Sequence, residues 1–250
     1  MGRRMLALWC VGGVLVLIPC RVNAEDLGGD RPDFTESPVS VPAGMIQIEF
    51  GAIWERTSSS LEALDAPELL IRWGLGYGWE ARFEVPGLVR LRGAMRESAR
   101  SDGALGFKRE LGEVLPATEA ALLVMASVPV GETWATSDRV DPLVALTWER
   151  ELGPGWALGG QTTAAWPSED RDRELNLGQT LVLAHDLTPG WGTFLELAGE
   201  RPRGGRTALL LHQGVTRAVG RRGQVDVHWG VGLNRHAPNY FVGAGYIQRF

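Results

Sequence analysis

The sequence predicts an all-β protein, a transmembrane antiparallel β-barrel of about 12 strands that follows a cleaved signal peptide and a short irregular N-terminal segment. Three observations predict this fold. Segments in which apolar and polar side chains alternate recur from residue 45 to the end of the chain. The connections between these segments are short and long in turn. The chain ends inside its last alternating segment, on the aromatic residue Phe250.

Residues 1–24 are expected to be a secretory signal peptide that is removed. Arg3 and Arg4 precede the apolar run LALWCVGGVLVLIP, which is too short for a comfortable membrane span. The small residue Ala24, with Val22 two positions before it, suits cleavage by signal peptidase. We therefore expect an exported protein.

The only two cysteines, Cys10 and Cys20, lie in this removed segment. The mature protein is therefore expected to have neither disulfides nor thiolate chemistry. Cys20 also raises the alternative of a lipoprotein, but Pro19 stands where that cleavage requires a small residue, so signal peptidase cleavage is favoured.

Composition argues against nucleic acid as a partner. The chain has 30 acidic and 25 basic residues, and three of the basic ones, Arg3, Arg4 and Arg21, lie in the signal peptide. Beyond that peptide no stretch approaches the roughly 20 apolar residues of a membrane-spanning helix, and the longest candidate, 120–130, is too short. Any membrane crossing is therefore expected to use strands.

Residues 25–44 are expected to form an irregular periplasmic segment, because they are polar and contain the three prolines Pro32, Pro38 and Pro42. Such a segment can lie at the periplasmic mouth or enter the lumen as a plug or gate. The candidates for that role are Asp30, Arg31, Asp33 and Glu36.

Residues 45–250 are expected to form the barrel as one domain, because no low-complexity linker divides them. Alternation is clear where Trp79, Ala81 and Phe83 oppose Glu80 and Arg82. The polar face is also rich in glycine, which lets a sheet curl tightly and leaves room inside a closed barrel. The predicted strands are 45–56, 66–75, 79–89, 102–111, 118–129, 141–151, 156–166, 175–187, 191–200, 207–218, 224–234 and 239–250.

Connection lengths indicate which end of the barrel faces the periplasm. Short connections fall near 77, at 152–155, 187–190 and 220–223, and longer charged ones at 89–102, 131–141, 167–174 and 200–206. Outer-membrane barrels have short periplasmic turns and long outer loops. The connection at 111–118 is an exception, because it falls on the periplasmic side and is expected to be longer.

Tryptophans and the chain end fit the same fold. Trp73, Trp79, Trp156 and Trp191 flank the short turns, as expected for an interfacial aromatic girdle. The last strand, YFVGAGYIQRF, resembles the carboxy-terminal targeting signal of outer-membrane barrels, with Tyr246, Gln248 and Phe250 alternating outward. We therefore expect a monomer in the cell outer membrane, inserted by the barrel assembly machinery.

Residues 30–44, DRPDFTESPVSVPAG, together with ERPRGG (200–205) and APNYFVGAGYIQRF at the end, resemble a bacterial family of outer-membrane barrels, the phenol-degradation MetA-pathway-like proteins. The resemblance extends over essentially the whole mature chain. The resemblance implies an outer-membrane barrel and a role in transport, and it adds more about the fold than about the solute.

Polar side chains on the inward face are candidates for the lumen lining, and inside a narrow barrel their charges must pair. Glu80, Arg82 and Glu84, with Arg72 on the neighbouring strand, are expected to form such a ladder, which either plugs the barrel or lines a selective pore. The candidates are Glu49, Arg72, Glu80, Arg82, Glu84, Glu196, His212, Asp226 and His228.

No catalytic, metal or cofactor site is expected. No serine nucleophile stands on a strand beside a histidine, and His212, His228 and Asp226 lack the spacing of a zinc site. The sequence thus favours a transporter or narrow channel for small solutes, aromatic or hydrophobic ones included. Alternatives are an outer-membrane enzyme acting on lipid, a non-conducting structural or binding barrel, and, at the level of the fold, a soluble periplasmic β-sandwich.

Overall fold

The computed structural model describes residues 27–250 except 170–171 and 203. The expected signal peptide, 1–24, lies outside the described residues. The strands are β1 Ile46–Ser58, β2 Leu61–Gly76, β3 Trp79–Val85, β4 Leu88–Gly93, β5 Glu97–Arg100, β6 Gly103–Leu115, β7 Thr118–Val128, β8 Pro142–Gly153, β9 Trp156–Ala165, β10 Ser168–Glu169, β11 Asp172–Arg173, β12 Asn176–Thr188, β13 Trp191–Pro202, β14 Ala208–Val219, β15 Gly223–Gly232 and β16 Tyr240–Arg249.

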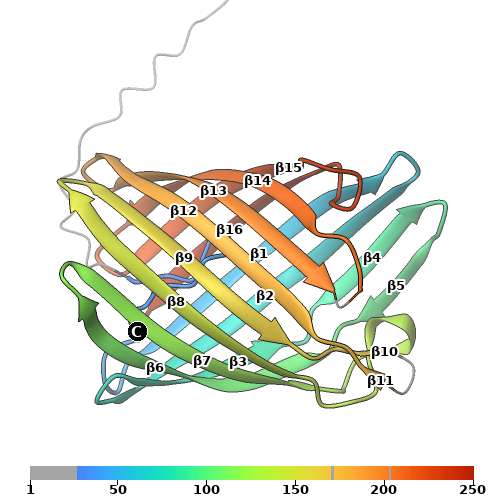
Figure 1. The fold of residues 1–250 in the computed structure, drawn as a ribbon, viewed down its shortest axis with the longest axis horizontal. Helices are drawn as coiled ribbons and strands as arrows, with labels where there is room; N and C mark the ends of the chain where they lie inside the picture. The colour runs from blue at the N-terminus through green and yellow to red at the C-terminus, as the bar shows by residue number, and fades with distance from the viewer. Residues whose placement is uncertain (1–26, 170–171, 203) are drawn as a thin grey trace, which may run out of the picture.

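These strands make a closed 12-stranded antiparallel barrel. Two strands of the barrel are each interrupted and so consist of two segments. β3 and β4 are separated by Pro86–Gly87, and both pair with β2. β5 and β6 are separated in the same way by Ser101–Asp102. The small β10–β11 hairpin pairs only with itself. Figure 1 shows the strands winding obliquely around a cylinder, with β4, β5, β10 and β11 gathered at one end.

The first and last strands close the cylinder. β1 pairs with β2 on one side and with β16 on the other, in a register that runs from Gln47 opposite Arg249 to Arg56 opposite Tyr240. The backbone N–H of Phe250 continues this ladder by donating to the carbonyl of Ile46 at 2.8 Å. Closure satisfies the backbone groups of both edges, which a sheet surrounded by lipid requires.

The end that carries the chain terminus has short turns, and one expectation about it was wrong. β6 and β7 extend to a two-residue turn at Pro116–Ala117, so the connection at 111–118 is short. Register shifts between Glu110 and Gly112 and between Glu113 and Leu115 interrupt the alternation of apolar and polar side chains there. The sequence pattern therefore did not predict this part of the strand.

The opposite end also has more strand than expected. Residues 89–102, predicted to be a loop, form most of the β4–β5 hairpin, and β1 and β2 extend to a two-residue connection at Ser59–Ser60. Within the described chain, the 3₁₀ turn Thr133–Ala135 is the one helical element, and none is long and apolar enough to cross a membrane.

The two faces of the barrel have opposite polarity. On β15 the outward Val227 is 52% exposed, whereas the inward His228 is 1% exposed, and the same alternation runs around the sheet. The outer face carries a continuous band of exposed Leu, Val, Phe and Trp, far larger than a soluble monomer tolerates. Inside lie many charged and polar side chains, together with buried apolar ones such as Leu123, Phe194 and Phe241.

Tryptophans ring the short-turn end of the outer face. Trp73, Trp79, Trp156 and Trp191 are each exposed there. Arg109 lies 5.5 Å from the ring centre of Trp79. Arg217 lies 5.1 Å from that of Trp191. An aromatic body beside a cationic group suits the boundary between acyl chains and headgroups.

Candidate functional site

The chain that precedes β1 runs inside the barrel. We call residues 27–44 the lumen segment; in Figure 1 it is the blue trace within the cylinder. Buried Arg249 donates to the carbonyl of Leu27 at one end of the segment. At the other end Gly44 N–H donates to Gly74 O at 2.8 Å. Between these ends side chains of the wall, not strand pairing, hold the segment in place.

Asp30 is the centre of a buried charge cluster. Its carboxylate lies 2.5 Å from Arg82 Nη1 and 2.9 Å from Lys108 Nζ. It also lies 3.2 Å from Arg72 Nη1. Burial alone would raise the pKa of Asp30, but the positive charges of Arg72, Lys108 and Arg82 outweigh it and hold the pKa well below its usual range. Asp30 is therefore a carboxylate on which three wall cations converge.

Glu80 of β3 extends the same cluster. Arg72 binds it with two parallel hydrogen bonds, Nε to Oε1 at 2.8 Å and Nη2 to Oε2 at 2.9 Å. Glu80 Oε2 also accepts the backbone N–H of Val41 at 2.8 Å. Glu49 of β1 accepts from Arg72 at 2.8 Å. The wall charges thus pair with each other and with the lumen segment, as burial requires.

Arg31 binds an adjoining part of the wall, formed by β2, β1, β16 and β15. Its Nη1 lies 2.8 Å from Glu68 Oε2 and its Nε 3.5 Å from Asp226 Oδ2. Gly51 and Gly245 face each other on β1 and β16, and a Cβ on either would collide with the guanidinium. These two glycines are therefore needed for Arg31 to lie against the wall.

Phe34 and Thr35 contact a third group of wall residues. The backbone N–H of Phe34 donates to Glu196 Oε2 at 2.9 Å, and the Thr35 hydroxyl donates to Glu196 Oε1 at 2.7 Å. The Phe34 ring centre lies 4.4 Å from that of His212 and 5.7 Å from that of Phe241. Polar and aromatic contacts meet here at adjacent residues.

Glu196 begins a chain of hydrogen bonds through two histidines. His212 Nδ1 lies 2.8 Å from Glu196 Oε2, and His212 Nε2 lies 2.9 Å from His228 Nδ1. His228 Nε2 is 3.4 Å from Arg31 Nη2. Every bond is satisfied with both imidazoles neutral, if each donates from Nδ1 and accepts at Nε2. The chain then links the negative Glu196 to the positive Arg31.

Glu36 and Asp33 are the two acids of the lumen segment whose pKa values are raised on balance. Burial raises the pKa of Glu36 to about 7, although Arg82 and Lys108 oppose the shift. Arg82 Nη2 lies 2.8 Å from its carboxylate. Burial, with repulsion from Glu196, raises the pKa of Asp33 well above its usual range. Ionisation of these two groups therefore opposes the buried position of the segment.

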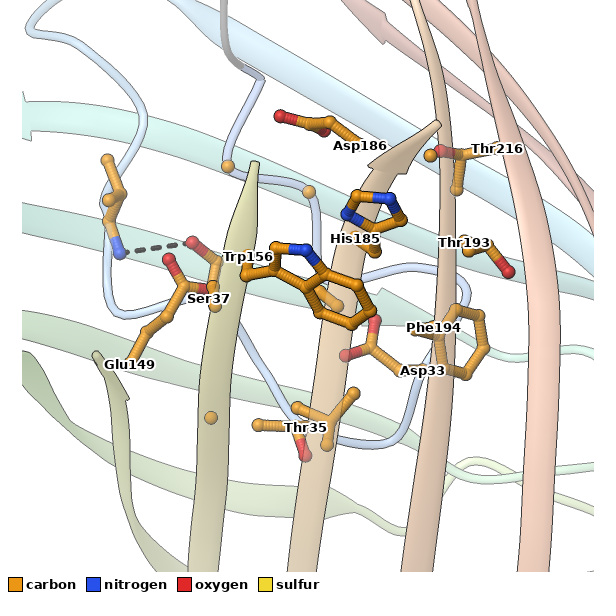
Figure 2. A pocket seen from close by; sticks show the side chains of 18 of the residues that line it. Asp33, Thr35, Ser37, Glu149, Trp156, His185, Asp186, Thr193, Phe194 and Thr216 are labelled. Atoms are coloured by element: carbon orange, nitrogen blue, oxygen red, sulfur yellow. Dashed lines mark hydrogen bonds between the residues drawn. The ribbon is translucent and has the colours of Figure 1, made fainter. Parts of the chain in front are cut away.

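The lumen segment separates two cavities. A cavity of about 790 Å³ lies towards the short turns, and Figure 2 shows Asp33, Thr35 and Ser37 of the segment around it with Glu149 and Phe194 of the wall. A second cavity, of about 320 Å³, lies towards the long connections and is lined by several acids. Arg31 lines both cavities, so the segment stands between them.

Most residues singled out in the sequence lie in this interior. Eight of the lining candidates are buried inside the barrel: Glu49, Arg72, Glu80, Arg82, Glu196, His212, Asp226 and His228. Glu84 is exposed in the smaller cavity. Asp30, Arg31, Asp33 and Glu36 belong to the lumen segment, and Tyr246, Gln248 and Phe250 have the outward parity of β16.

Sequence reasoning missed the aromatic part of the site. Phe194 and Phe241 share the inward parity of Glu196 and Gly243, and an aromatic side chain on an otherwise polar face is the signal that could have identified them. Among the described residues no group of three His, Asp or Glu side chains is arranged to hold a metal ion.

Solved structures with the same fold are bacterial barrels. The COG4313 outer membrane channel from Pseudomonas putida F1 matches with a TM-score of 0.67 and 14% identity, over 85% of this chain and 97% of that one. The KdgM porin in complex with disordered oligogalacturonate matches with a TM-score of 0.60 and 8% identity, over 82% and 99%. The translocator domain of autotransporter NalP from Neisseria meningitidis matches with a TM-score of 0.52 and 12% identity, over 82% and 87%. At these identities the likeness shows the fold alone.

No curated protein matches the sequence significantly. A family model described as "Putative MetA-pathway of phenol degradation" matches residues 29–250, which include the lumen segment from Gly29 onward and every strand. The chain belongs to that family.

Proposed function

We propose that this protein is an outer-membrane channel for small solutes and that the lumen segment is its gate. The observation that carries the proposal is the position of the segment between two cavities that open towards opposite ends of the barrel. A solute that crossed the barrel would have to pass it.

The bonds that hold the segment suit a gate. Its contacts with the wall are dominated by ion pairs and hydrogen bonds, such as those of Asp30 with Lys108 and of Thr35 with Glu196. Water can replace such contacts group by group, whereas a packed apolar interface has no comparable substitute in water. The polar wall left behind would be solvated when the segment moves out.

The barrel itself supports the outer membrane as the location. Its apolar outer band and its Trp girdle fit a bilayer, and its strand pairing leaves no edge exposed to lipid. We also propose that the protein is exported through a cleaved signal peptide. The barrel assembly machinery would then recognise the Tyr246–Phe250 ending and insert the protein as a monomer. A 12-stranded barrel has a modest lumen, which suits a narrow pore for small molecules rather than a wide porin channel.

Planar bilayer recording tests the proposal. We expect the protein that lacks residues 25–40 to have a higher single-channel conductance than the full mature chain, because this deletion removes the Asp30, Arg31 and Glu36 contacts. Heat-modifiable migration on a gel confirms that each variant is a closed barrel. Equal conductance of the two proteins, both folded, contradicts the gate, and the absence of current from both, together with no swelling of liposomes in small neutral solutes, contradicts the channel.

A further inference from the structure

Four side chains of the β4–β5 hairpin share a basic groove at the end of the barrel that carries the long connections. We call Arg90, Arg92, Arg96 and Ser98 the arginine groove. Its volume is about 530 Å³, within the range of small-ligand sites. Figure 1 shows the hairpin at one end of the cylinder. None of the four residues lines either of the two cavities beside the lumen segment, so the groove is a separate feature.

Strand pairing shows which way the arginines point. Val89 of β4 pairs with Ala99 of β5, and Ala99 is only 1% exposed, so this face of the hairpin is turned inward. Arg90 pairs with Ser98 on the other face, and Arg92 has the same parity as Arg90. The groove therefore lies on the outer face of the sheet. A solute inside the barrel would not meet it.

The groove begins where the lipid-facing band ends. Arg90 lies opposite Leu64 of β2, and Leu64 lies opposite Trp54 of β1. The ring centre of Trp54 is 5.6 Å from that of Tyr240, an aromatic pair that suits the membrane interface. Leu88, two residues before Arg90 on the same face, is still 41% exposed. The arginines are thus at the level of the lipid headgroups, where a basic side chain can keep its charge in water.

The three arginines of the groove have no acidic partner in the protein, unlike the arginines around them. Arg56 pairs with Glu62 at 3.2 Å, and Arg100 pairs with Glu132 at 3.5 Å. Across residues 27–250, apart from 170–171 and 203, no acid forms an ion pair with the groove arginines. Glu97 also lines the groove, but its position in β5 has the inward parity. A ligand with several negative charges would relieve the repulsion between the three cations.

We propose that the arginine groove binds the bisphosphorylated headgroup of a glycolipid in the outer leaflet of the outer membrane. Guanidinium groups hold phosphate oxygens through pairs of parallel hydrogen bonds, and Ser98 adds a hydroxyl donor. Clusters of basic side chains at the membrane surface attract anionic lipids. The acyl chains of the glycolipid would lie along the apolar outer face, beside Leu64 and Leu88.

The groove selects among anionic headgroups. A phospholipid diester carries a single negative phosphate, which leaves part of the cationic charge unpaired, whereas two phosphates can engage all three arginines. Free phosphate would bring charge but would not use the apolar face beside Leu88. The inference rests on the proposed outer-membrane location. It does not depend on the gate, because the lumen segment lies on the other side of the sheet.

Native mass spectrometry of the full mature protein in detergent micelles, titrated with bisphosphorylated lipid A, tests the proposal. The groove variant replaces Arg90, Arg92 and Arg96 by Gln. Each basic residue at an anionic surface contributes about fivefold in affinity, so we expect this variant to bind on the order of 100-fold more weakly than wild type. Replacement of the same three residues by Lys keeps the charge but loses the paired hydrogen bonds, so that variant should fall between the two.

A control variant removes the same charge elsewhere. Arg201, Arg206 and Arg235 are exposed at the same end of the barrel, in or beside the β13–β14 and β15–β16 connections. Their replacement by Gln should leave lipid A binding as in wild type, because they do not share the groove. Heat-modifiable migration on a gel checks that every variant is a closed barrel.

Three results would overturn the groove: no lipid A binding by wild type, equal binding by wild type and the groove variant, or equal losses in the groove and control variants. Phosphatidylglycerol or inorganic phosphate bound as tightly as lipid A would overturn the glycolipid. Unchanged lipid binding with an altered anion preference of the current in planar bilayers would assign the arginines to solute capture instead. Membrane fractionation of cells tests the location by itself, so its failure is distinct from a failure of the groove.

Discussion

Lys108 of β6 reaches Asp30 of the lumen segment with an Nζ–Oδ1 distance of 2.9 Å, although 78 positions separate them in the sequence. Both side chains are buried, and Arg72 and Arg82 approach the same carboxylate. One carboxylate of the segment therefore pairs with three cations of the wall, two of which also pair with the wall acids Glu49 and Glu80.

Asp30→Asn should open the channel. The variant leaves Arg72, Arg82 and Lys108 with less negative charge, and breaking a buried pair from one side costs about 3–5 kcal/mol, which favours hydration of the lumen. We expect a higher open probability in planar bilayers and a lower urea midpoint of unfolding. Asp138→Asn, in an outer loop, is the control and should change neither. A closed channel in folded Asp30→Asn would show that Asp30 does not hold the gate.

A disulfide between the segment and the wall should close the channel reversibly. The Cβ that Gly159 lacks would lie 3.7 Å from Thr35 Cγ2, so side chains at these two positions meet, and the pair Gly159→Cys with Thr35→Cys is the cross-link to test. The mature chain is expected to contain no other cysteine, so the pair has no competitor. We expect low current under oxidising conditions and recovery after reduction. Each single-cysteine variant should ignore the reductant, and a current that is equal in both redox states of a fully cross-linked sample refutes a moving segment.

Conductance should rise as the pH increases from about 5 to 8. In the docked segment burial raises the pKa of Glu36 to about 7, whereas a solvated Glu titrates near 4.3. Protonated Glu36 therefore stabilises the docked segment most when the pH is below the solvated pKa of about 4.3. This stabilisation, up to about 3 kcal/mol, is lost as the pH rises through the docked pKa of about 7. Asp33, whose pKa is also raised, acts in the same direction.

Glu36→Gln should flatten this pH dependence, and the comparison isolates Glu36 because Asp33 remains. In the docked segment the pKa of Asp30 is held well below its usual range, so Asp30 stays ionised over the whole interval and does not contribute to the slope. A conductance that falls with pH in wild type, or a slope that is unchanged in Glu36→Gln, contradicts the assignment.

Gly230→Ala, on the inner face, should destabilise the barrel more than the larger substitution Ala244→Val on the outer face. Its Cβ would meet the ring of Phe241, which cannot retreat from a packed wall without strain of about 1–3 kcal/mol. We expect a lower urea midpoint for the refolded protein. Ala244→Val adds more volume but on the exposed outer face, so it should leave the midpoint nearly unchanged. Equal midpoints for all three proteins would mean that the ring moves freely.

The sequence predicts the barrel well wherever lipid and lumen impose opposite polarity. The predicted strand 224–234 corresponds to β15, because Val227 and His228 face different surroundings. Beyond the bilayer both faces of a strand meet water, so the pattern fades while the pairing continues. The β4–β5 hairpin, expected to be a loop, is such a case.

The sequence predicted which charged side chains face the lumen, but not which residues of the lumen segment they contact. Parity places Arg72 and Glu80 on the inner face of neighbouring strands, and the structure has them bonded. No spacing rule could join Asp30 to Lys108 or Phe34 to His212, because an irregular segment has no register with the wall. The aromatic contacts were missed for that reason.

The lumen segment precedes β1, and β1 pairs with β16, so the sheet remains open until the last residues of the chain are in place. The three cations that Asp30 contacts lie on β2, β3 and β6, all in the first half of the chain. Asp30 and these cations therefore belong to one continuous half of the chain, and their pairing requires no strand of the other half. The charge cluster can therefore form independently of the β1–β16 seam, and that seam need not close over charges that still lack a partner.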